Sequence, residues 1–278
     1  MKVSFFDRKV FKKYGDIITW GSVIITFLSV IIPFPENWSR LCAVVILAVI
    51  FVVIYIGVWI WANRKKRTII YLHETRILIE EGNLFAAPGK KLIPFNEYFD
   101  TEVGNGIIDE MSLNGQYIKK YTKNTPEDLY KSILSKLNSK GKKPVLVDES
   151  RLSGHKVKYE LGTICDDGNN YLLMAYSHFD TDNRAYLTQE DILQCYINMW
   201  NEIDIIRGND SISIPLLGGS GLVRFRKDYS PQQLVELLLW SFSISGIHLS
   251  RNATLRIVLG KDVVQDIDLL RLMVYSEK

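Results

Sequence analysis

Residues 212–221 read ISIPLLGGSG, a short apolar run of strand character that leads directly into a glycine-rich turn. Glycines there let the backbone approach a ligand closely, and they turn successive N–H groups toward one anion. Arg224 and Arg226 follow and add positive charge. The pattern favours a phosphate-binding loop at the end of a strand, with a plain tight turn as the alternative. It is neither a Walker loop nor a GxGxxG loop, so hydrolysis of nucleoside triphosphates is not expected.

Strands and helices alternate on both sides of this turn. Apolar alternation or short apolar runs predict strands at residues 76–80, 91–95, 158–163, 171–177, 211–217 and 253–259. Helices are predicted at residues 126–138 and 187–206, capped by Thr125 and Thr188, and from Ser230-Pro231 onward. This order predicts one α/β domain over residues 67–278, with a largely parallel or mixed sheet flanked by helices.

A polar loop follows the predicted strand at residues 91–95. It begins at Asn96 and continues through Gly104, Gly106 and Gly115. Ligands of open α/β sheets bind at the carboxyl ends of the strands, so this loop and the turn at 218–221 are predicted to face one cleft. Asn96 could hydrogen-bond to ribose hydroxyls, or it could stabilise its own turn.

Two long uncharged runs, residues 17–34 and 41–62, lie near the N-terminus. As helices they would extend roughly 27 Å and 33 Å, against a hydrocarbon core of about 30 Å. Lysines and arginines precede the first run and follow the second at residues 64–67, whereas the link between the runs carries one arginine, Arg40. The positive-inside rule then puts both termini in the cytoplasm. We therefore expect a two-helix transmembrane hairpin over residues 1–66 rather than a cleaved signal peptide.

The first of these runs carries a narrow stripe of hydroxyl side chains. The stripe consists of Thr19, Ser22, Thr26 and Ser29, whose spacing returns them to one helix face. The hydroxyls could bond back to their own helix and form a packing seam against the second run. They could instead line a water-filled path when several copies gather.

Other residue patterns argue against several functional classes. The net charge of +3 gives no reason to expect nucleic-acid binding. Cys42, Cys165 and Cys195 have no CxxC or zinc-type spacing, and they are expected to be reduced packing residues. The four histidines are dispersed, and His178 beside two aspartates suits a solvated loop better than a metal site. No catalytic residue and no metal ligand is predicted.

Four pieces of the chain resemble, in order, the ligand loops of macro domains: EGNLF at 81–85, FNEYFDT at 95–101, SLNGQ at 112–116 and PLLGGSG at 215–221. They are most similar to the divergent macro domain of the membrane-anchored Thoeris anti-phage effectors, from about residue 75 to the C-terminus. The resemblance implies a sensor, not an enzyme, in the bacterial inner membrane. Its activating ligand would be an ADP-ribose derivative, such as a histidine conjugate, made by a partner TIR-domain enzyme. Binding would trigger homo-oligomerisation and membrane disruption.

The resemblance also implies which residues bind the ligand. They are Asn83, Leu84, Asn96, Glu97, Tyr98, Phe99, Asp100, Leu217, Gly218, Gly219, Ser220, Gly221 and Arg224. Asn83 stands where these domains usually carry an aspartate that holds the adenine amino group, and an Asn carbonyl can still accept that bond. Tyr98, Phe99 and Asp100 occupy the place of the second, catalytic asparagine of hydrolytic macro domains. A membrane-tethered hydrolase of ADP-ribose derivatives is the alternative function, and a passive scaffold is a third.

Overall fold

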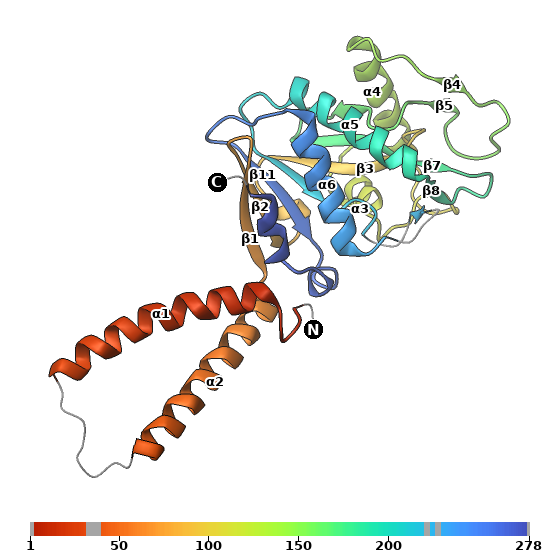
Figure 1. Ribbon diagram of the computed structural model, residues 1–278. Helices are drawn as coiled ribbons and strands as arrows, with labels where there is room; N and C mark the ends of the chain where they lie inside the picture. The colour runs from red at the N-terminus through yellow and green to blue at the C-terminus, as the bar shows by residue number, and fades with distance from the viewer. Residues whose placement is uncertain (1–2, 32–39, 220–222, 226–228, 277–278) are drawn as a thin grey trace.

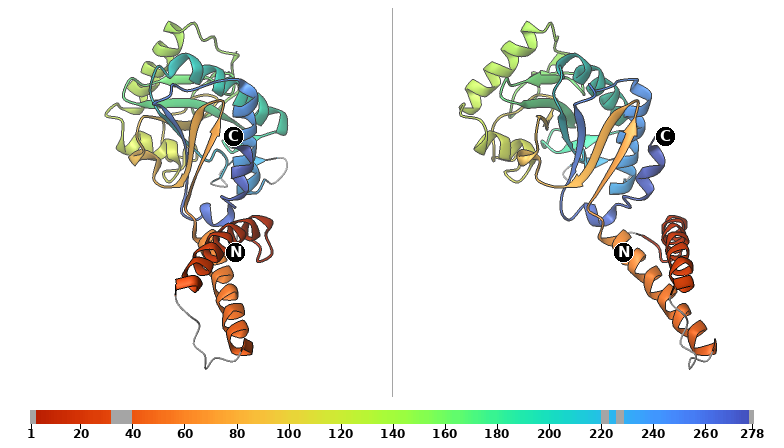
Figure 2. Two further views of the ribbon diagram at one scale, coloured as in Figure 1. Left: turned by 60° about the vertical axis from the view of Figure 1, so that its left-hand side comes forward. Right: turned by 90° about the vertical axis from the view of Figure 1, so that its left-hand side faces the viewer.

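The computed structural model describes residues 3–31, 40–219, 223–225 and 229–276. A pair of N-terminal helices, α1 (Arg8–Ile31) and α2 (Arg40–Arg64), is joined to an α/β body that contains all the strands (Figure 1). The body begins at β1 (Arg67–Leu72), so only Lys65 and Lys66 separate the second helix from the first strand. The two helices leave the body together at one end of it (Figure 2).

The main sheet is mixed, in the order β1-β2-β11-β9-β3-β7-β8-β10, with β6 paired to β7. Its central strands run parallel: β11 with β2 and β9, and β3 with β9 and β7. The strands after β1 are β2 (Thr75–Glu81), β3 (Lys90–Asn96), β6 (Ile164–Asp166), β7 (Tyr171–Phe179), β8 (Ala185–Leu187), β9 (Ile212–Pro215), β10 (Arg224–Phe225) and β11 (Thr254–Leu259). A separate hairpin, β4 (Leu146–Val147) and β5 (Val157–Lys158), stands apart from this sheet.

Helices cover both faces of the sheet. One face packs against α5 (Gln189–Ile206) and α6 (Pro231–Ser245), and the other against α3 (Leu113–Lys120) and α4 (Pro126–Ser139). Alternation along the strands divides the core accordingly: Leu92 belongs to the first cluster and its neighbour Ile93 to the second. The predicted α/β class with a mixed, helix-flanked sheet is confirmed.

The predicted helix caps are also found. Thr125, Thr188 and Ser230 accept hydrogen bonds from the third residue of α4, α5 and α6 respectively. At Thr188 and Ser230 the bond is reciprocated, which completes a capping box.

One predicted strand, residues 158–163, is wrong. Strand β5 ends at Lys158, and the following residues turn instead of extending. The reason is Gly162, whose φ of 89° lies in the left-handed region that breaks an extended strand. Its N–H donates to Ala175 O, so the segment is tied to β7 by irregular bonds.

The helix pair meets the expectation of a transmembrane hairpin only in part. Among the described residues, one helical segment, Val44–Arg64, is long and apolar enough to cross a membrane. Only 6% of its most apolar stretch of 18 residues is buried within the protein. Helix α1 covers residues 17–31 of the first expected span, and its described part does not give a second segment of that length and apolarity. The end of that span, residues 32–34, lies outside the described residues.

Candidate ligand-binding cleft

A cleft of about 700 Å³ opens at the carboxyl ends of the parallel strands. Its walls come from the residues that follow β2, β3, β7, β9 and β11, together with the start of α3. This is the edge at which open α/β sheets bind ligands, because the loops there are free to vary while the strands hold them in place. Asn96, the last residue of β3, and Gly218 of the glycine-rich turn both line the cleft, whereas residues 97–100 of the predicted loop do not.

The glycine-rich turn forms one wall. Leu217, Gly218 and Gly219 line the cleft, and Gly218 has a φ of 77°, a backbone conformation that favours glycine. A Cβ on Gly219 would lie 2.9 Å from Leu216 Cδ2, so this position is closely packed. Ser220 and Gly221 lie outside the described residues. The backbone of Arg224 belongs to β10, which pairs with β8, and its side chain is outside the described part of the chain.

The turn after β2 forms a second wall. Asn83 caps the short 3-10 helix η1 (Leu84–Ala86): its Oδ1 accepts a hydrogen bond of 3.0 Å from Phe85 N. Asn83 is exposed and lines the cleft together with Leu84 and Phe85. A carbonyl oxygen has two lone pairs, so Asn83 can accept a further bond from a ligand.

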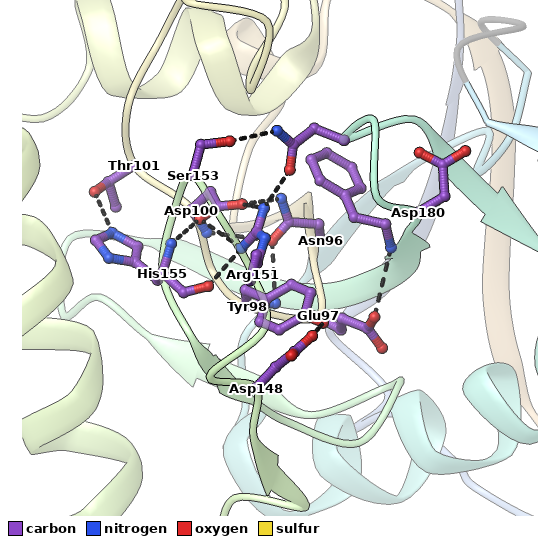
Figure 3. A network of polar contacts seen from close by, with 12 residues as sticks. Asn96, Glu97, Tyr98, Asp100, Thr101, Asp148, Arg151, Ser153, His155 and Asp180 are labelled. Carbon is purple, nitrogen blue, oxygen red and sulfur yellow. Dashed lines mark hydrogen bonds and ion pairs between the residues drawn. The ribbon is translucent and has the colours of Figure 1, made fainter.

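Asn96 lies at the floor of the cleft with its side chain engaged by its own loop. Its Oδ1 accepts from Tyr98 N at 3.0 Å and from Asp100 N at 3.2 Å, and its Nδ2 donates to Asp100 Oδ2 at 2.8 Å. Figure 3 shows Asn96 within the polar network of this loop. Of the two roles considered for Asn96, stabilising its own turn is the one that these contacts support.

The four residues after Asn96 occupy positions outside the cleft lining. Phe99 is fully buried in the second core cluster, between Phe95 and Tyr159. Tyr98 donates to Asp148 Oδ2 at 3.0 Å, and burial, with that bond, raises its pKa. Both aromatic side chains are therefore engaged by contacts within the protein and not in the cleft.

Asp100 is the centre of a buried polar network (Figure 3). Its carboxylate, 1% exposed, forms a bidentate ion pair with Arg151, at 2.6 Å and 3.1 Å, and also accepts from His155 N. Arg151 donates in addition to Asn183 Oδ1 at 2.8 Å and lies over the Tyr98 ring. The network connects the segment that contains β4 and β5 to the loop that follows β3.

Glu97 belongs to a second buried cluster. It accepts from His178 Nδ1 at 2.5 Å and pairs with Lys158 at 2.9 Å, while His178 Nε2 lies 3.4 Å from Asp191 Oδ1. Burial lowers the pKa of His178, but the hydrogen bonds and charges of Glu97 and Asp191 outweigh it, so the net pKa is raised. His178 therefore lies between two carboxylates, Glu97 in the loop after β3 and Asp191 in the first turn of α5, and it connects these two elements.

The cleft contains residues that sequence reasoning did not select. They are Asp109, Tyr176, Ser177, Phe179, Asn183, Arg184, Gly260 and Val263, among others. Asn183 and Arg184 follow β7, and Gly260 follows β11. Their position after a predicted strand was therefore the sequence feature that could have identified them as residues of the cleft. Among the described residues no group of His, Cys, Asp or Glu could hold a metal ion.

The hydroxyl stripe of α1 lies far from this cleft in the helix pair. Thr19, Ser22 and Thr26 donate to carbonyls of their own helix three or four residues back, at 2.8–2.9 Å. The side chain of Ser29 is outside the described residues. These are the bonds expected of hydroxyls that satisfy themselves within a helix.

Comparisons with known proteins agree with the four sequence pieces. A family model described as "Thoeris protein ThsA, Macro domain" matches residues 77–260. The chain is 31% identical over 280 residues to the Thoeris protein ThsA of Bacillus amyloliquefaciens (strain Y2), covering 97% of this chain and 91% of that protein. A solved mutant macrodomain of Oceanobacillus iheyensis aligns with a TM-score of 0.45 and 11% identity, over 75% of this chain and 92% of that one. The family model and the relative confirm the predicted resemblance to Thoeris proteins with a macro domain. The chain belongs to the family of Thoeris ThsA proteins and carries their macro domain.

Proposed function

We propose that the chain is a membrane-bound effector of Thoeris anti-phage defence that is switched on by a nucleotide-derived signal. The observation that carries the proposal is the cleft at the carboxyl ends of the parallel strands, bounded by the Gly218–Gly219 turn. The activating ligand is an ADP-ribose derivative, such as an amino-acid conjugate with histidine, made by a partner TIR-domain enzyme. The chain itself acts as a sensor and not as an enzyme.

The dimensions and lining of the cleft support this ligand class. Its volume of about 700 Å³ lies within the range of about 300–1,000 Å³ typical of small-molecule sites. Apolar side chains around Asn83, including Leu84 and Phe85, suit a purine ring. The backbone of Gly218 and Gly219 suits the diphosphate. The far end, where Asn183 and Arg184 line the cleft, remains for the distal ribose and a conjugated group.

The helix pair supports a role at a membrane. Segment Val44–Arg64 has the length and apolarity of a span, and large apolar side chains along it, such as Val44 and Val53, are exposed. Basic residues follow directly at 65–67, so the body would lie on the cytoplasmic side of the bacterial inner membrane. In this proposal, ligand binding gathers several copies, and their helix pairs together disrupt the bilayer.

Calorimetry on the full chain in detergent micelles tests the ligand. ADP-ribose and its histidine conjugate should bind, and Gly219→Val should reduce affinity at least tenfold, because a side chain there displaces Leu216 within the cleft wall. The control is Gly57→Val, at an exposed glycine of α2 whose φ lies outside the left-handed region and where an added Cβ would meet no atom within 4 Å. Unchanged affinity in a folded Gly219→Val protein would remove the turn from the site.

The same samples separate the sensor from the alternative hydrolase. Under the sensor proposal, chromatography after prolonged incubation recovers the nucleotide intact. Release of a cleaved product at a rate that depends on the protein would establish the hydrolase instead. If the chain binds none of these nucleotides, the third alternative, a passive scaffold, would be supported instead.

A further inference from the structure

The N-terminal segment of the chain lies against one face of the C-terminal part of α2. Tyr55, Trp59 and Asn63 are spaced by four residues, so they lie on one side of the helix. Trp59 Nε1 donates to Val3 O at 3.1 Å, Asn63 Oδ1 accepts from Val3 N at 3.1 Å, and the Tyr55 hydroxyl donates to Phe5 O. The start of the chain is therefore fastened to the last turns of α2 by hydrogen bonds at both backbone groups of Val3.

An apolar cluster lies under these bonds and includes a residue of the α/β body. Val3 and Val10, at 1% and 0% exposure, pack with Val58 and Ala62 of α2, whereas most of the helix pair is exposed. Leu270, from the C-terminal segment of the body, packs against this cluster. We call the cluster of Val3, Val10, Val58 and Ala62, together with Leu270 packed against it, the junction.

Leu270 belongs to a segment that starts in the cleft. The segment leaves β11 at Gly260 and Val263, which line the cleft, and continues through η2 (Val264–Asp266) into η3 (Arg271–Tyr275). Between the two ends, Val264, Ile267 and Leu269 are buried in the first core cluster. The segment therefore runs from the wall of the cleft to the junction through continuous packing.

Polar bonds fix the segment just before the junction. Asp268 N donates to Gln232 Oε1 of α6 at 2.8 Å, and Asp268 Oδ1 accepts from Leu270 N at 2.9 Å and from Arg271 N at 3.0 Å. Arg271 in turn pairs with Glu236 of α6 at 2.7 Å. Because densely packed segments shift as units and do not deform continuously, a displacement at one end is expected to reach the other.

We propose that residues 260–272 couple the cleft to the helix pair. A ligand that contacts the turn at Gly260–Val263 shifts this segment, Leu270 moves against the junction, and the packing of α1 on α2 changes. The coupling is a property of the fold, and its use in signalling rests on the function proposed above. Since coupling free energies are reciprocal, a change at the junction must also reach the cleft.

Hydrogen exchange on the full chain in micelles tests the coupling without any ligand. Leu270 is only partly buried, so Leu270→Ala is expected to fold, which a thermal melt checks. Amide exchange should rise severalfold both at residues 3–10 and at residues 258–264. The matched control is Val274→Ala on the same segment, a side chain 74% exposed that should change neither region. An effect of Leu270→Ala confined to residues 268–272 would overturn the proposal.

Addition of ADP-ribose extends the test to the occupied cleft. In the parent protein, ADP-ribose should slow exchange at residues 258–264 and alter it at residues 3–10, whereas Leu270→Ala should keep the first change and lose the second. Equal changes at residues 3–10 in both proteins would overturn the coupling. No change at residues 258–264 of the parent would reject the proposed ligand, and the ligand-free comparison would still decide the coupling.

Discussion

Removal of Arg151 should destabilise the body strongly, because it leaves the buried carboxylate of Asp100 without its ionic partner. The perturbation is Arg151→Met, which keeps much of the side-chain length and removes the charge and all donors. Asp100 would then hold a buried carboxylate with two remaining donors, Asn96 Nδ2 and His155 N. Asn183 Oδ1 and His155 O would each lose a donor from the same guanidinium.

The size of the effect follows from these contacts. Removing one partner of a buried ion pair typically costs about 3–5 kcal/mol, and the donors left to Asp100 place this case near the lower end, at about 3 kcal/mol. For a domain of this size, each kcal/mol lowers the melting temperature by about 2–4 °C, so we expect a decrease of about 6–12 °C. Asp100→Asn in the Arg151→Met background should restore part of the loss, because no buried charge then lacks its partner.

Thermal unfolding followed by circular dichroism measures these differences. Arg184→Met is the matched control, since Arg184 has a 64% exposed side chain and only a 3.7 Å pair with Asp182. Its unfolding free energy should stay within about 0.5 kcal/mol of the parent. A decrease below about 3 °C for Arg151→Met, or no recovery in the double variant, would refute the assigned role of the pair.

Three further outcomes follow from individual contacts. Because the pKa of His178 is raised in the fold, the stabilisation that its protonated ring provides is fully present below the unfolded pKa of about 6.5 and is lost as the pH rises through the folded pKa. In denaturant titrations, the difference in unfolding free energy between the parent and His178→Gln should therefore shrink from about pH 6 to about pH 9. A difference that widens over this range would contradict the assignment. Gly162→Ala should cost more than about 2 kcal/mol, since φ is 89° and the Cβ would lie 2.6 Å from Cys195 O, whereas Gly141→Ala, with φ of 70° in open space, should cost only about 1 kcal/mol. If the α1 stripe lines a water-filled path, Ser22→Val with Thr26→Val should abolish ligand-triggered dye leakage from liposomes without weakening binding; leakage equal to the parent would leave the stripe as a packing seam.

Strands with a clear apolar pattern were predictable, and the first strand was not. The central strands β2, β3, β7, β9 and β11 are each short apolar runs that stand out from their flanks. In β1, Ile70 and Leu72 are buried, but the outward positions are Ile69 and Tyr71, which are 39% and 49% exposed. Apolar residues on both faces hide the period of two on which strand prediction depends.

The cleft was predictable where it depends on local sequence and not where it depends on distant partners. The glycine-rich turn and the Asn83 turn line the cleft, since each follows directly from a strand end. The loop from Glu97 to Asp100 was expected to face the ligand, yet its partners Asp148, Arg151 and His155 come from about fifty residues later in the chain. No local pattern in residues 96–101 reveals that residues 148–155 fold back and form contacts with their side chains.

The connection between α2 and β1 has a consequence for how copies meet. With only Lys65 and Lys66 between a helix and a strand of the sheet, the chain has little length in which to absorb a rotation of the body. If α2 crosses the bilayer as proposed, every copy presents its sheet at a similar tilt and height above the lipid. Encounters between copies then depend on lateral diffusion and on one angle about the membrane normal, in place of three orientational coordinates. Such a restricted search raises the rate at which matching faces meet, without any added contact between them.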